Sequence, residues 1–393
     1  MTVTRLVNLN IFDGEAVSQH TSIQFDTTGI AWLGDSSSVT KNMERADNII
    51  DGEGAWLLPG LMDAHIHLEL DPNEKSPPAP DAPRDLEAMA ERARLMVAAG
   101  ITTARDLGGG VWAEFGIRDR ILAGEIPGPR LVCAGQPITS MGGHCHFWGG
   151  EVETLYQAKA VMQRQIDKGA DLLKVMATGG RFTANSSPSK AQFEQSFMTD
   201  LVAAANAANL TVAAHCHGSE GIRHAAFAGV TTIEHCSWVG NDGKWASDYQ
   251  PAVVTEMANR GVWVSPTVNA NWQRFIDSEA KMITTFRDCY DKMRAAGVQL
   301  VASTDAGIPG VVHHELPKAV HVFAQIAGLT PAEAIQTATA NAADALGISA
   351  ITGRVRTGLA ADLLLFEENP LDNLTVLQRP AAIWARGTVV KPV

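Results

Sequence analysis

Short apolar runs alternate with helical patterns along most of the chain, from residue 61 onward. Between the runs, apolar residues recur every three or four positions, which is the spacing of an amphipathic helix. The runs, each of which we interpret as a strand, are Leu61–His65, Ile101–Arg105, Arg130–Ala134, Asp171–Met176, Thr211–His215, Val230–His235, Val262–Pro266 and Val298–Ser303. Eight successive strand and helix units predict an α/β fold with a parallel (β/α)₈ TIM-like barrel, and an open doubly wound sheet is the alternative.

The helical segments between the strands end in a common way. Glycine adopts the left-handed backbone of a helix end at little cost, so it acts as a stop signal. Glycines of this kind come just before several predicted strands: Gly100, Gly169, Gly229, Gly261 and Gly297. The predicted helices include Asp85–Ala99, Glu151–Lys168, Lys190–Ala208 and Phe275–Ala296.

The two ends of the chain show a different pattern, with short alternating strands and no long helical segment. The predicted strands are Arg5–Asn8, Ser22–Asp26, Ile30–Gly34, Asn48–Asp51, Ala361–Phe366, Ala382–Arg386 and Thr388–Val390. Neither end has enough strands for a stable sandwich by itself. We therefore expect one small β-sandwich domain built from residues 1–58 and 353–393, with residues 59–352 forming the barrel.

Composition narrows the class of protein. Hydrophobic residues make up 46% of the chain and charged residues 19%, which suits a large buried core and argues against disorder. Asp and Glu outnumber Lys and Arg by 43 to 31, and the formal net charge is −12. An acidic chain without a basic run is a poor partner for nucleic acid or anionic membranes. We expect a small-molecule substrate instead, and association of the chain into a homo-oligomer.

The chain start and the cysteines bear on localisation. The apolar stretches are far too short for a membrane span. Residues 1–10 lack the basic and apolar segments of a secretory signal. The 5 cysteines are scattered and odd in number, which suits a reducing compartment better than a disulfide framework. We expect a cytoplasmic protein.

Polar residues collect at the ends of the predicted strands. His65 and His67 end the first strand two positions apart, so alternation points both into the barrel interior. His215 ends the fifth strand, His235 ends the sixth, and Asp305 follows the eighth. The carboxyl ends of barrel strands meet at one face, where the active sites of such barrels lie. Four imidazoles and a carboxylate suit zinc or another borderline transition metal ion.

Lys174 places a basic group in the middle of the fourth predicted strand. A charged ammonium is costly inside a barrel, unless it is paired with a carboxylate or extends to solvent. A neutral lysine can instead react with carbon dioxide to give a carbamate, whose two oxygens can bridge two metal ions. The spacing of Lys174 does not decide between these alternatives.

These residues lie in motifs that resemble the amidohydrolase superfamily. The matching motifs are Pro59–His67 (Pro-Gly-Leu-Met-Asp-Ala-His-Ile-His), Lys174, His215, Glu234-His235 and Ser303–Gly307 (Ser-Thr-Asp-Ala-Gly). The likeness covers nearly the whole chain, because residues 353–365 look like the return into the composite β-domain of these enzymes. Met141–His144 and Lys174–Gly180 are similar to the prolidase-like and imidazolonepropionase-like members, which include Xaa-Pro dipeptidases and ochratoxin-type amidases.

The resemblance implies a binuclear zinc centre. By the family's pattern, one zinc ion is held by His65, His67 and Asp305, the other by His215 and His235, and a carboxylated Lys174 bridges the two. Glu234 precedes a ligand, so alternation points it away from the site, in a structural or supporting role. Many relatives have Tyr at the position of His217, which leaves the role of His217 open.

The same resemblance implies a reaction. A hydroxide that bridges the two ions attacks an amide-type carbonyl. Asp305 takes the proton of this hydroxide and passes it to the leaving nitrogen, while His144 helps to stabilise the oxyanion. The 9 Trp against 3 Tyr, several of them in loops after strands, favour a large apolar or aromatic substrate. The predicted substrate contacts are His217, His146, Arg181, Trp148, Trp238 and His314.

Together these features predict a metal-dependent amidohydrolase that cleaves an amide, a dipeptide or an N-acyl amino acid. The same site would also serve a hydrolase of carbamates, phenylureas or esters. A mononuclear deaminase needs no bridging ligand, so Lys174 argues against it. A catalytically inactive scaffold is the remaining alternative, and the complete set of ligands argues against it.

Overall fold

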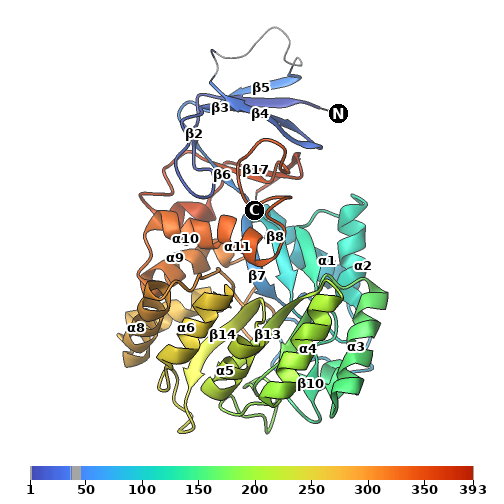
Figure 1. Ribbon diagram of the computed structural model, residues 1–393. Helices are drawn as coiled ribbons and strands as arrows, with labels where there is room; N and C mark the ends of the chain where they lie inside the picture. The colour runs from blue at the N-terminus through green and yellow to red at the C-terminus, as the bar shows by residue number, and fades with distance from the viewer. Residues whose placement is uncertain (1, 36, 38–45, 393) are drawn as a thin grey trace.

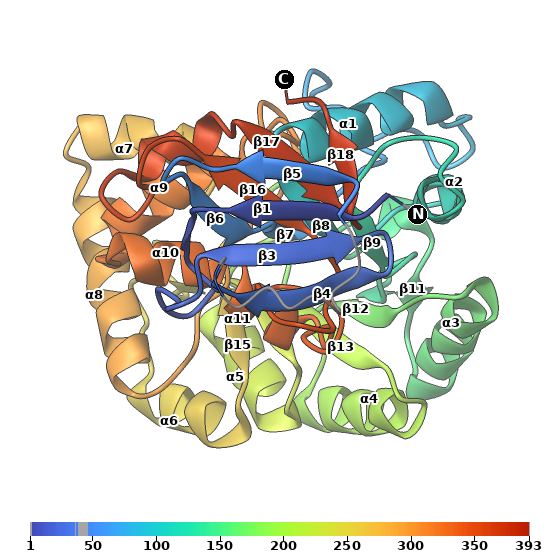
Figure 2. The same cartoon turned by 90° about the horizontal axis from the view of Figure 1, so that it is seen from above.

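The computed structural model of this 393-residue chain describes residues 2–35, 37 and 46–392. Parallel strands lie at the centre, and helices surround them. Seen from above in Figure 2, the helices from α1 (Leu86–Ala98) to α6 (Pro251–Arg260), and then α8 (Lys281–Ala295), follow one another around the strands in chain order. Strands from the two chain ends form a layer at one end of the molecule, blue and red in Figure 1.

Seven of the eight apolar runs form strands in the described part of the chain. They group into two parallel sheets: β7 (Leu61–Ile66), β8 (Ile101–Asp106) and β9 (Arg130–Cys133) in the first, and β12 (Leu172–Met176), β13 (Thr211–Gly218), β14 (Thr232–Val239) and β15 (Trp263–Ser265) in the second. Single parallel bridges continue the pairing beyond these sheets: Ile138 to Val175, Val264 to Leu300 and Ile66 to Ala306.

The eighth run, Val298–Ser303, is not a strand, which corrects the prediction. It forms one bridge, at Leu300. The backbone N–H of Ala302 donates to the carbonyl oxygen of Thr337 at 3.0 Å. The backbone N–H of Thr304 donates to the Asp63 carboxylate at 3.1 Å. Because these donors are used elsewhere, a regular ladder with β7 does not form in this segment.

The helix ends largely follow the sequence signals. The remaining helices are α2 (Ala113–Leu122), α3 (Leu155–Lys168), α4 (Gln195–Ala207), α5 (Ser219–Ala228), α7 (Gln273–Asp277), α9 (Leu316–Ala327), α10 (Pro331–Thr337) and α11 (Ala340–Ala345). Gly169 follows α3 with φ of 82°, and Gly229 follows α5 with φ of 74°, so these predicted stops are confirmed. The segment predicted as one helix over residues 275–296 is two helices, α7 and α8, and Glu279 between them has φ of 50°.

One predicted helix starts later than its hydrophobic pattern. Residues 151–152 form a short strand, β11 (Glu151–Val152), which pairs with β10 (Thr139–Ser140). Thr154 then caps α3 in a reciprocal capping box with Gln157. Such a box satisfies two backbone donors of the first turn, so it fixes the start of the helix.

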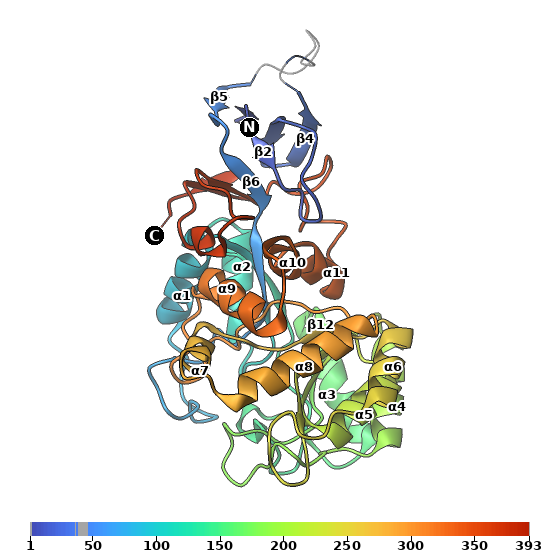
Figure 3. The same ribbon diagram turned by 90° about the vertical axis from the view of Figure 1, so that its left-hand side faces the viewer.

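The two chain ends supply two further sheets. One has the order β4 (Gly29–Gly34), β3 (Ser22–Asp26), β1 (Thr4–Val7), β5 (Asn48–Asp51), and the other β18 (Thr388–Val390), β17 (Ala382–Ala385), β16 (Leu363–Phe366), β6 (Trp56–Pro59), β2 (Asn10–Ile11). Leu57 of β6 pairs with Leu365 of β16, so strands from both ends share one sheet. In Figure 3, β6 runs from this layer down toward the helices, and only Gly60 separates it from β7.

The apolar core lies between the parallel strands and the helices around them. Ile233 of β14, Ile222 of α5 and Met257 of α6 are fully buried members of one cluster. Burying such side chains contributes about 1.5–3 kcal/mol each, and it keeps the strand ends in fixed positions. No helix in the described part of the chain is long and apolar enough to cross a membrane.

Candidate metal-binding active site

A cavity of about 350 Å³ opens at the carboxyl ends of the parallel strands. Its lining brings together residues that are far apart in the sequence. All the predicted metal ligands lie in it: His65, His67, Lys174, His215, His235 and Asp305. Their spacing along the chain therefore reflects the strand order, and the fold collects them at one place.

His65, His67 and Asp305 form the first cluster. Nε2 of His65 and Nε2 of His67 are 3.3 Å apart. Oδ1 of Asp305 lies 3.4 Å from each of these two nitrogens. Three potential ligand atoms thus converge from β7, from the residue that follows it and from Asp305.

The tautomers of the first cluster follow from the opposite ring nitrogens. Nδ1 of His65 faces a carboxylate oxygen of Glu234 at 3.0 Å, and Nδ1 of His67 faces the carbonyl oxygen of Gly108 at 3.0 Å. Both partners only accept hydrogen bonds, so each Nδ1 carries the proton. The lone pairs of the two Nε2 atoms therefore face each other and the Asp305 carboxylate. This arrangement is repulsive unless a cation lies among them, so the residues fit a metal ion.

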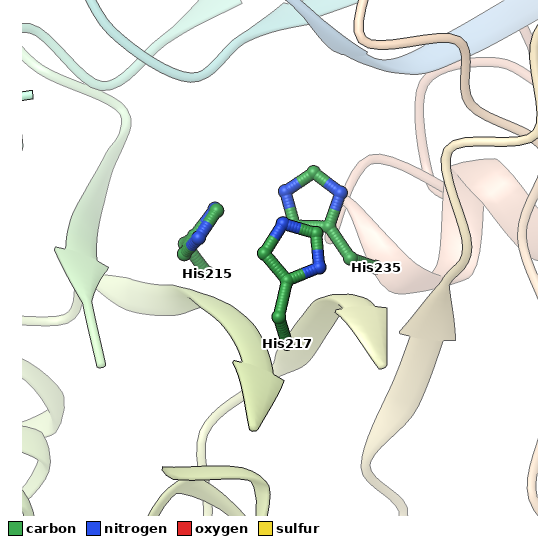
Figure 4. A group of neighbouring side chains, drawn as sticks. All are labelled: His215, His217 and His235. Atoms are coloured by element: carbon green, nitrogen blue, oxygen red, sulfur yellow. The ribbon is translucent and has the colours of Figure 1, made fainter. Parts of the chain in front are cut away.

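His215, His217 and His235 form the second cluster, and one ring nitrogen from each lies within 4.8 Å of the others. Figure 4 shows the three imidazoles gathered at the ends of β13 and β14. The rings of His217 and His235 stack at 4.4 Å, and the ring of His215 lies 4.5 Å from that of His235. The structure thus groups His217, which was predicted as a substrate contact, with the two predicted ligands.

The second cluster is oriented by neutral partners. Nε2 of His215 faces the carbonyl oxygen of Gly179 at 3.1 Å, so its Nδ1 is the nitrogen without a proton. Nδ1 of His235 is bonded to Thr267 Oγ1 at 2.8 Å, and Nδ1 of His217 to Ser237 Oγ at 2.9 Å. Such outer hydrogen bonds fix ring orientation in metal sites.

Left-handed backbone conformations collect at these strand ends. His235 has φ of 66°, Cys236 48°, Thr267 57° and Asp305 60°. Such conformations are uncommon for residues with a side chain, and a β-branched residue such as Thr267 is a genuine outlier. Strained residues of this kind concentrate at functional sites, where the surrounding structure holds them in place.

Lys174 of β12 is buried at the cavity wall, with 1% of its surface exposed. No carboxylate of the described residues forms an ion pair with it. Burial lowers the pKa of Lys174 from 10.5 to about 8, so a neutral amine is accessible. Lys174 lines the same cavity as both clusters, and its charge adds to burial in lowering the pKa of His65 and of His235.

The imidazoles of the site are kept neutral. Burial, followed by the charge of Lys174, lowers the pKa of His65 to about 4. Burial and the neighbouring His144 lower the pKa of His217 to about 3. Burial also lowers the pKa of His215 and His235 well below the ordinary range. Neutral imidazole is the form that binds metal ions, so each ring offers the lone pair of its unprotonated nitrogen at neutral pH.

Glu234 is a direct neighbour of the first cluster, although alternation along the strand predicted that it would point away. It contacts His65, and its other oxygen is paired with Arg105 at 2.8 Å. Burial raises the pKa of Glu234, but Arg105 and His65 together hold it below its ordinary value. The left-handed backbone of His235 and Cys236 breaks the alternation, so both Glu234 and His235 reach the interior.

His144 lies in the cavity wall beside the second cluster. Its ring is 4.5 Å from that of His215, and its Nδ1 is bonded to Thr183 Oγ1 at 3.0 Å. Burial lowers the pKa of His144 to about 3, so the ring is neutral. A side chain at Gly180 would collide with this ring, which explains a glycine at that position.

The rest of the cavity wall is largely apolar and aromatic. Among the predicted substrate contacts, Trp148, His217 and Arg181 line it. The Arg181 guanidinium is exposed and lies 4.9 Å from the centre of the Trp245 ring. The apolar and aromatic members of the wall include Leu70, Met176, Phe182, Trp245, Trp272 and Ile308.

Three predicted substrate contacts lie outside this cavity. His146 is in a short 3₁₀ turn, His146–Trp148, of which only Trp148 reaches the wall. Trp238 is fully buried and packs on Tyr249 at 5.2 Å. His314 lines a different hollow, beside Lys318 and the start of α9. The preceding residue, His313, turns inward and bonds the His67 carbonyl oxygen at 3.1 Å.

Several residues of the site carry no sequence signal. The hydroxyls of Thr183, Ser237 and Thr267 orient imidazoles, yet they belong to no motif of ligand spacing. Asn269 also lines the cavity, and its side chain is fixed by the carbonyl oxygen of Thr304 at 3.3 Å. The one sequence signal for Ser237 and Thr267 is that each lies one or two residues after the end of a predicted strand, Val230–His235 or Val262–Pro266.

Fold and site together define an α/β enzyme whose candidate metal ligands lie at the carboxyl ends of parallel strands. The chain matches the amidohydrolase family over residues 56–393, and it belongs to that family. The predicted resemblance is thus confirmed. Members are typically metal-dependent, which agrees with the two clusters of candidate ligands.

Relatives are similar along nearly the whole chain. Ochratoxinase of Aspergillus niger is 28% identical over 421 residues, covering 96% of this chain and 84% of its own. Imidazolonepropionase of Acidiphilium cryptum is 26% identical over 388 residues, covering 91% and 89%. The crystal structure of a Xaa-Pro dipeptidase with bound methionine in the active site has a TM-score of 0.83 at 26% identity and covers 99% of both chains. The chain therefore has a TIM-barrel-like α/β fold and is a hydrolase that acts on carbon–nitrogen bonds.

Proposed function

We propose that the protein is a binuclear, zinc-dependent hydrolase that cleaves the amide-type bond of a small molecule with an apolar or aromatic group. One observation carries the metal part of this proposal. Two unprotonated imidazole nitrogens and the Asp305 carboxylate face one another at 3.3–3.4 Å with no donor between them. A second group of ligands lies beside the first, since the rings of His65 and His235 are 5.3 Å apart.

His65, His67 and Asp305 would hold one ion, and His215 and His235 the other. Lys174, once carboxylated, would bridge them, and its lowered pKa of about 8 favours the neutral amine that reacts with carbon dioxide. Bound divalent ions supply Lewis-acid polarisation of a carbonyl and a lowered pKa for water. His217 lies close enough to be a further ligand, because its ring stacks on that of His235.

The side chains of the cavity would divide the remaining tasks. Asp305 accepts a proton from the attacking water at its carboxylate and passes it to the leaving nitrogen. The Thr183 hydroxyl would donate a hydrogen bond to Nδ1 of His144, which leaves the ring proton on Nε2. The neutral His144 then donates this proton in a hydrogen bond to the oxyanion. The aromatic wall around Trp148 and Trp245 excludes water from the bound group.

The shape and charge of the cavity favour one class of substrate. Its volume of about 350 Å³ is at the small end of the range for ligand pockets. The exposed guanidinium of Arg181 at the rim suits a carboxylate on the substrate. An N-acyl amino acid or a dipeptide with an apolar side chain meets both conditions.

The backbone bridges at Ile66, Ile138 and Val264 support the finer architecture that we propose, a ring of strands closed through residues 298–306. Such closure would bring the residues after β7 beside Asp305. The shared sheet of β6 and β16 likewise supports a small sandwich made from both chain ends.

A substrate panel tests the proposed reaction. Zinc-loaded enzyme is assayed against aromatic amides, N-acyl amino acids, dipeptides, carbamates, phenylureas and esters. The highest kcat/KM is expected for N-acyl amino acids or dipeptides with an apolar group. Arg181→Met is the matched variant, and it should raise KM for substrates with a free carboxylate but not for their carboxamides. Faster turnover of carbamates or phenylureas would contradict the amide assignment.

A further inference from the structure

A buried row of three side chains runs between the strands beside the first cluster. Arg105 of β8 donates from a terminal nitrogen to Oε1 of Glu234 at 2.8 Å. Oε2 of Glu234 in turn accepts a hydrogen bond from Nδ1 of His65 at 3.0 Å. The side chains of Arg105 and Glu234 are 2% and 0% exposed, so water does not compete for these bonds.

The two charged members of this row are fixed on every side. Arg105 Nε donates to the carbonyl oxygen of Ala64 at 2.7 Å, and its other terminal nitrogen donates to Thr232 Oγ1 at 3.0 Å. The hydroxyl of Thr232 donates to the same oxygen of Glu234 that Arg105 binds, at 2.5 Å. Oε2 of Glu234 is left for His65. Planar, multiply bonded guanidinium groups hold carboxylates in one orientation.

In each imidazole of the cavity, one ring nitrogen faces away from the other candidate ligands, and we call it the outer nitrogen. In the imidazoles other than His65, this outer nitrogen is hydrogen-bonded to a neutral group. Among the described residues of the cavity wall, His65 is the histidine whose outer nitrogen meets a carboxylate. The outer nitrogens of the rest meet backbone carbonyls, for His67 and His215, or hydroxyls, for His144, His217 and His235. The first cluster therefore has a negatively charged group hydrogen-bonded behind one of its imidazoles, and the second cluster has neutral groups behind its imidazoles.

We propose that Glu234, held by Arg105, is a positioning residue that fixes the tautomer and orientation of His65 and thereby sets the affinity of the first cluster for a divalent ion. This inference rests on the proposed function, because it concerns the same metal site. A carboxylate behind an imidazole makes the opposite nitrogen a stronger electron-pair donor, and partners of this kind change metal affinity by about 10–100-fold. Arg105 supplies the countercharge that makes a buried Glu234 tolerable.

The test removes the charge of Glu234 without leaving the charge of Arg105 buried and unpaired. Glu234→Gln alone would leave the buried charge of Arg105 without a carboxylate, so it is combined with Arg105→Met. Thermal unfolding checks that the double variant is folded. Zinc affinity is measured by competition with a chelator. Occupancy of each cluster at limiting zinc is measured by anomalous diffraction. We expect affinity at the first cluster to fall about 10–100-fold, with the second cluster unchanged.

Thr267→Val is the matched control for the second cluster. It removes the hydroxyl bonded to His235 and keeps the β-branched shape. This variant should weaken zinc binding at the second cluster and leave the first unchanged. A double variant that keeps wild-type affinity at the first cluster, or that weakens both clusters equally, overturns the positioning role.

Failure of the proposed function gives a different result. Wild-type protein that binds zinc, shows the expected loss in the double variant and hydrolyses no carbon–nitrogen bond in the panel would contradict the proposed reaction and leave the role of Glu234 standing. Wild-type protein that binds no zinc at either cluster would overturn both.

Discussion

Asp305 approaches His65 at two points. Its backbone N–H donates to the carbonyl oxygen of His65 at 2.9 Å, and its Oδ1 lies 3.4 Å from Nε2 of the same residue. The backbone bond holds position 305 next to β7 whatever its side chain is. Asp and Asn both tolerate the left-handed conformation that Asp305 adopts. The carboxylate can therefore be changed without displacing the segment.

Asp305→Asn should reduce turnover far more than zinc content. The amide keeps the size of the side chain and one oxygen ligand, but it cannot accept the proton. General acid–base catalysis contributes about 10²–10⁴-fold, and we expect a loss in kcat near the upper end. Steady-state kinetics with zinc analysis on the same sample checks this. A variant with both ions and more than about a tenth of wild-type turnover would assign proton transfer to another residue, with His217 and His144 as candidates.

Zinc content should reach two ions per chain after loading with zinc and bicarbonate. The ligands of the two clusters exceed the four that a single tetrahedral zinc ion takes. Elemental analysis measures the ratio. Removal of the ions with a chelator should lower the Tm, because ions that bind only the folded state stabilise it. One equivalent or less after full loading would argue for a mononuclear site.

Lys174 should carry a carboxyl group in the zinc-loaded protein. Its amine is buried and forms no ion pair with a carboxylate of the described residues, and burial lowers its pKa toward the neutral form although the charges of Glu234 and Asp305 act against this. Lys174→Ala should abolish nearly all activity, and short carboxylic acids should restore part of it by occupying the vacated space. Lys174→Met is the control that fills this space and should not be rescued. Electron density for a plain amine with both ions bound would refute the carboxylation.

Stability of the metal-free protein should fall as the pH falls below about 6.5, and His217 should account for part of the slope. Burial lowers the pKa of His217 to about 3 from 6.5, so between these values the unfolded state binds one proton more than the folded state. One such proton corresponds to about 1.4 kcal/mol of unfolding free energy per pH unit. Burial raises the pKa of Asp63 to about 7, which acts in the opposite direction, so the total slope mixes several groups.

A difference measurement isolates this contribution. Urea unfolding of wild-type protein and of His217→Gln is compared between pH 4 and pH 6 in the presence of a chelator. The variant should show a slope shallower by about 1.4 kcal/mol per pH unit. His20→Gln, at an exposed position, is the control for loss of an imidazole. Parallel slopes for wild type and His217→Gln would show that His217 is not kept neutral by the fold.

The sequence predicts the parallel strands well because their signals are local. A helical pattern that ends in a glycine and is followed by an apolar run of five or six residues marks β8 after Gly100, or β14 after Gly229, without knowledge of the rest of the chain. The gathering of the candidate ligands in one cavity also follows from the sequence, since strand ends of this fold share one face. The composition of segment 298–303 also predicts a strand, but the backbone N–H of Ala302 donates to Thr337, and that of Thr304, just after the segment, donates to Asp63.

The support of the site depends on backbone conformation, which the residue pattern does not reveal. Alternation assigned Glu234 to the side away from the ligands, but φ of 66° at His235 changes the direction of the chain. Trp238 is next to the site in sequence and was expected at the cavity, yet its own φ of 49° turns it into the core. Thr267 contributes through a similar departure from the extended strand. Each of these cases involves a left-handed residue that only the tertiary structure specifies.

The pairing of β6 with β16 determines which part of the chain can fold last while the protein is being synthesised. Leu57 leaves the ribosome long before Leu365 exists, so β6 must wait with an unpaired edge while the parallel strands and their helices are made. Pairing of such distant segments is slow, because a long loop has to close first. The small sheet is therefore completed last, after the strands that carry the candidate metal ligands have met. A nascent chain released before residue 363 would carry every one of those ligands and still expose the apolar edge of β6, which marks it for aggregation or degradation.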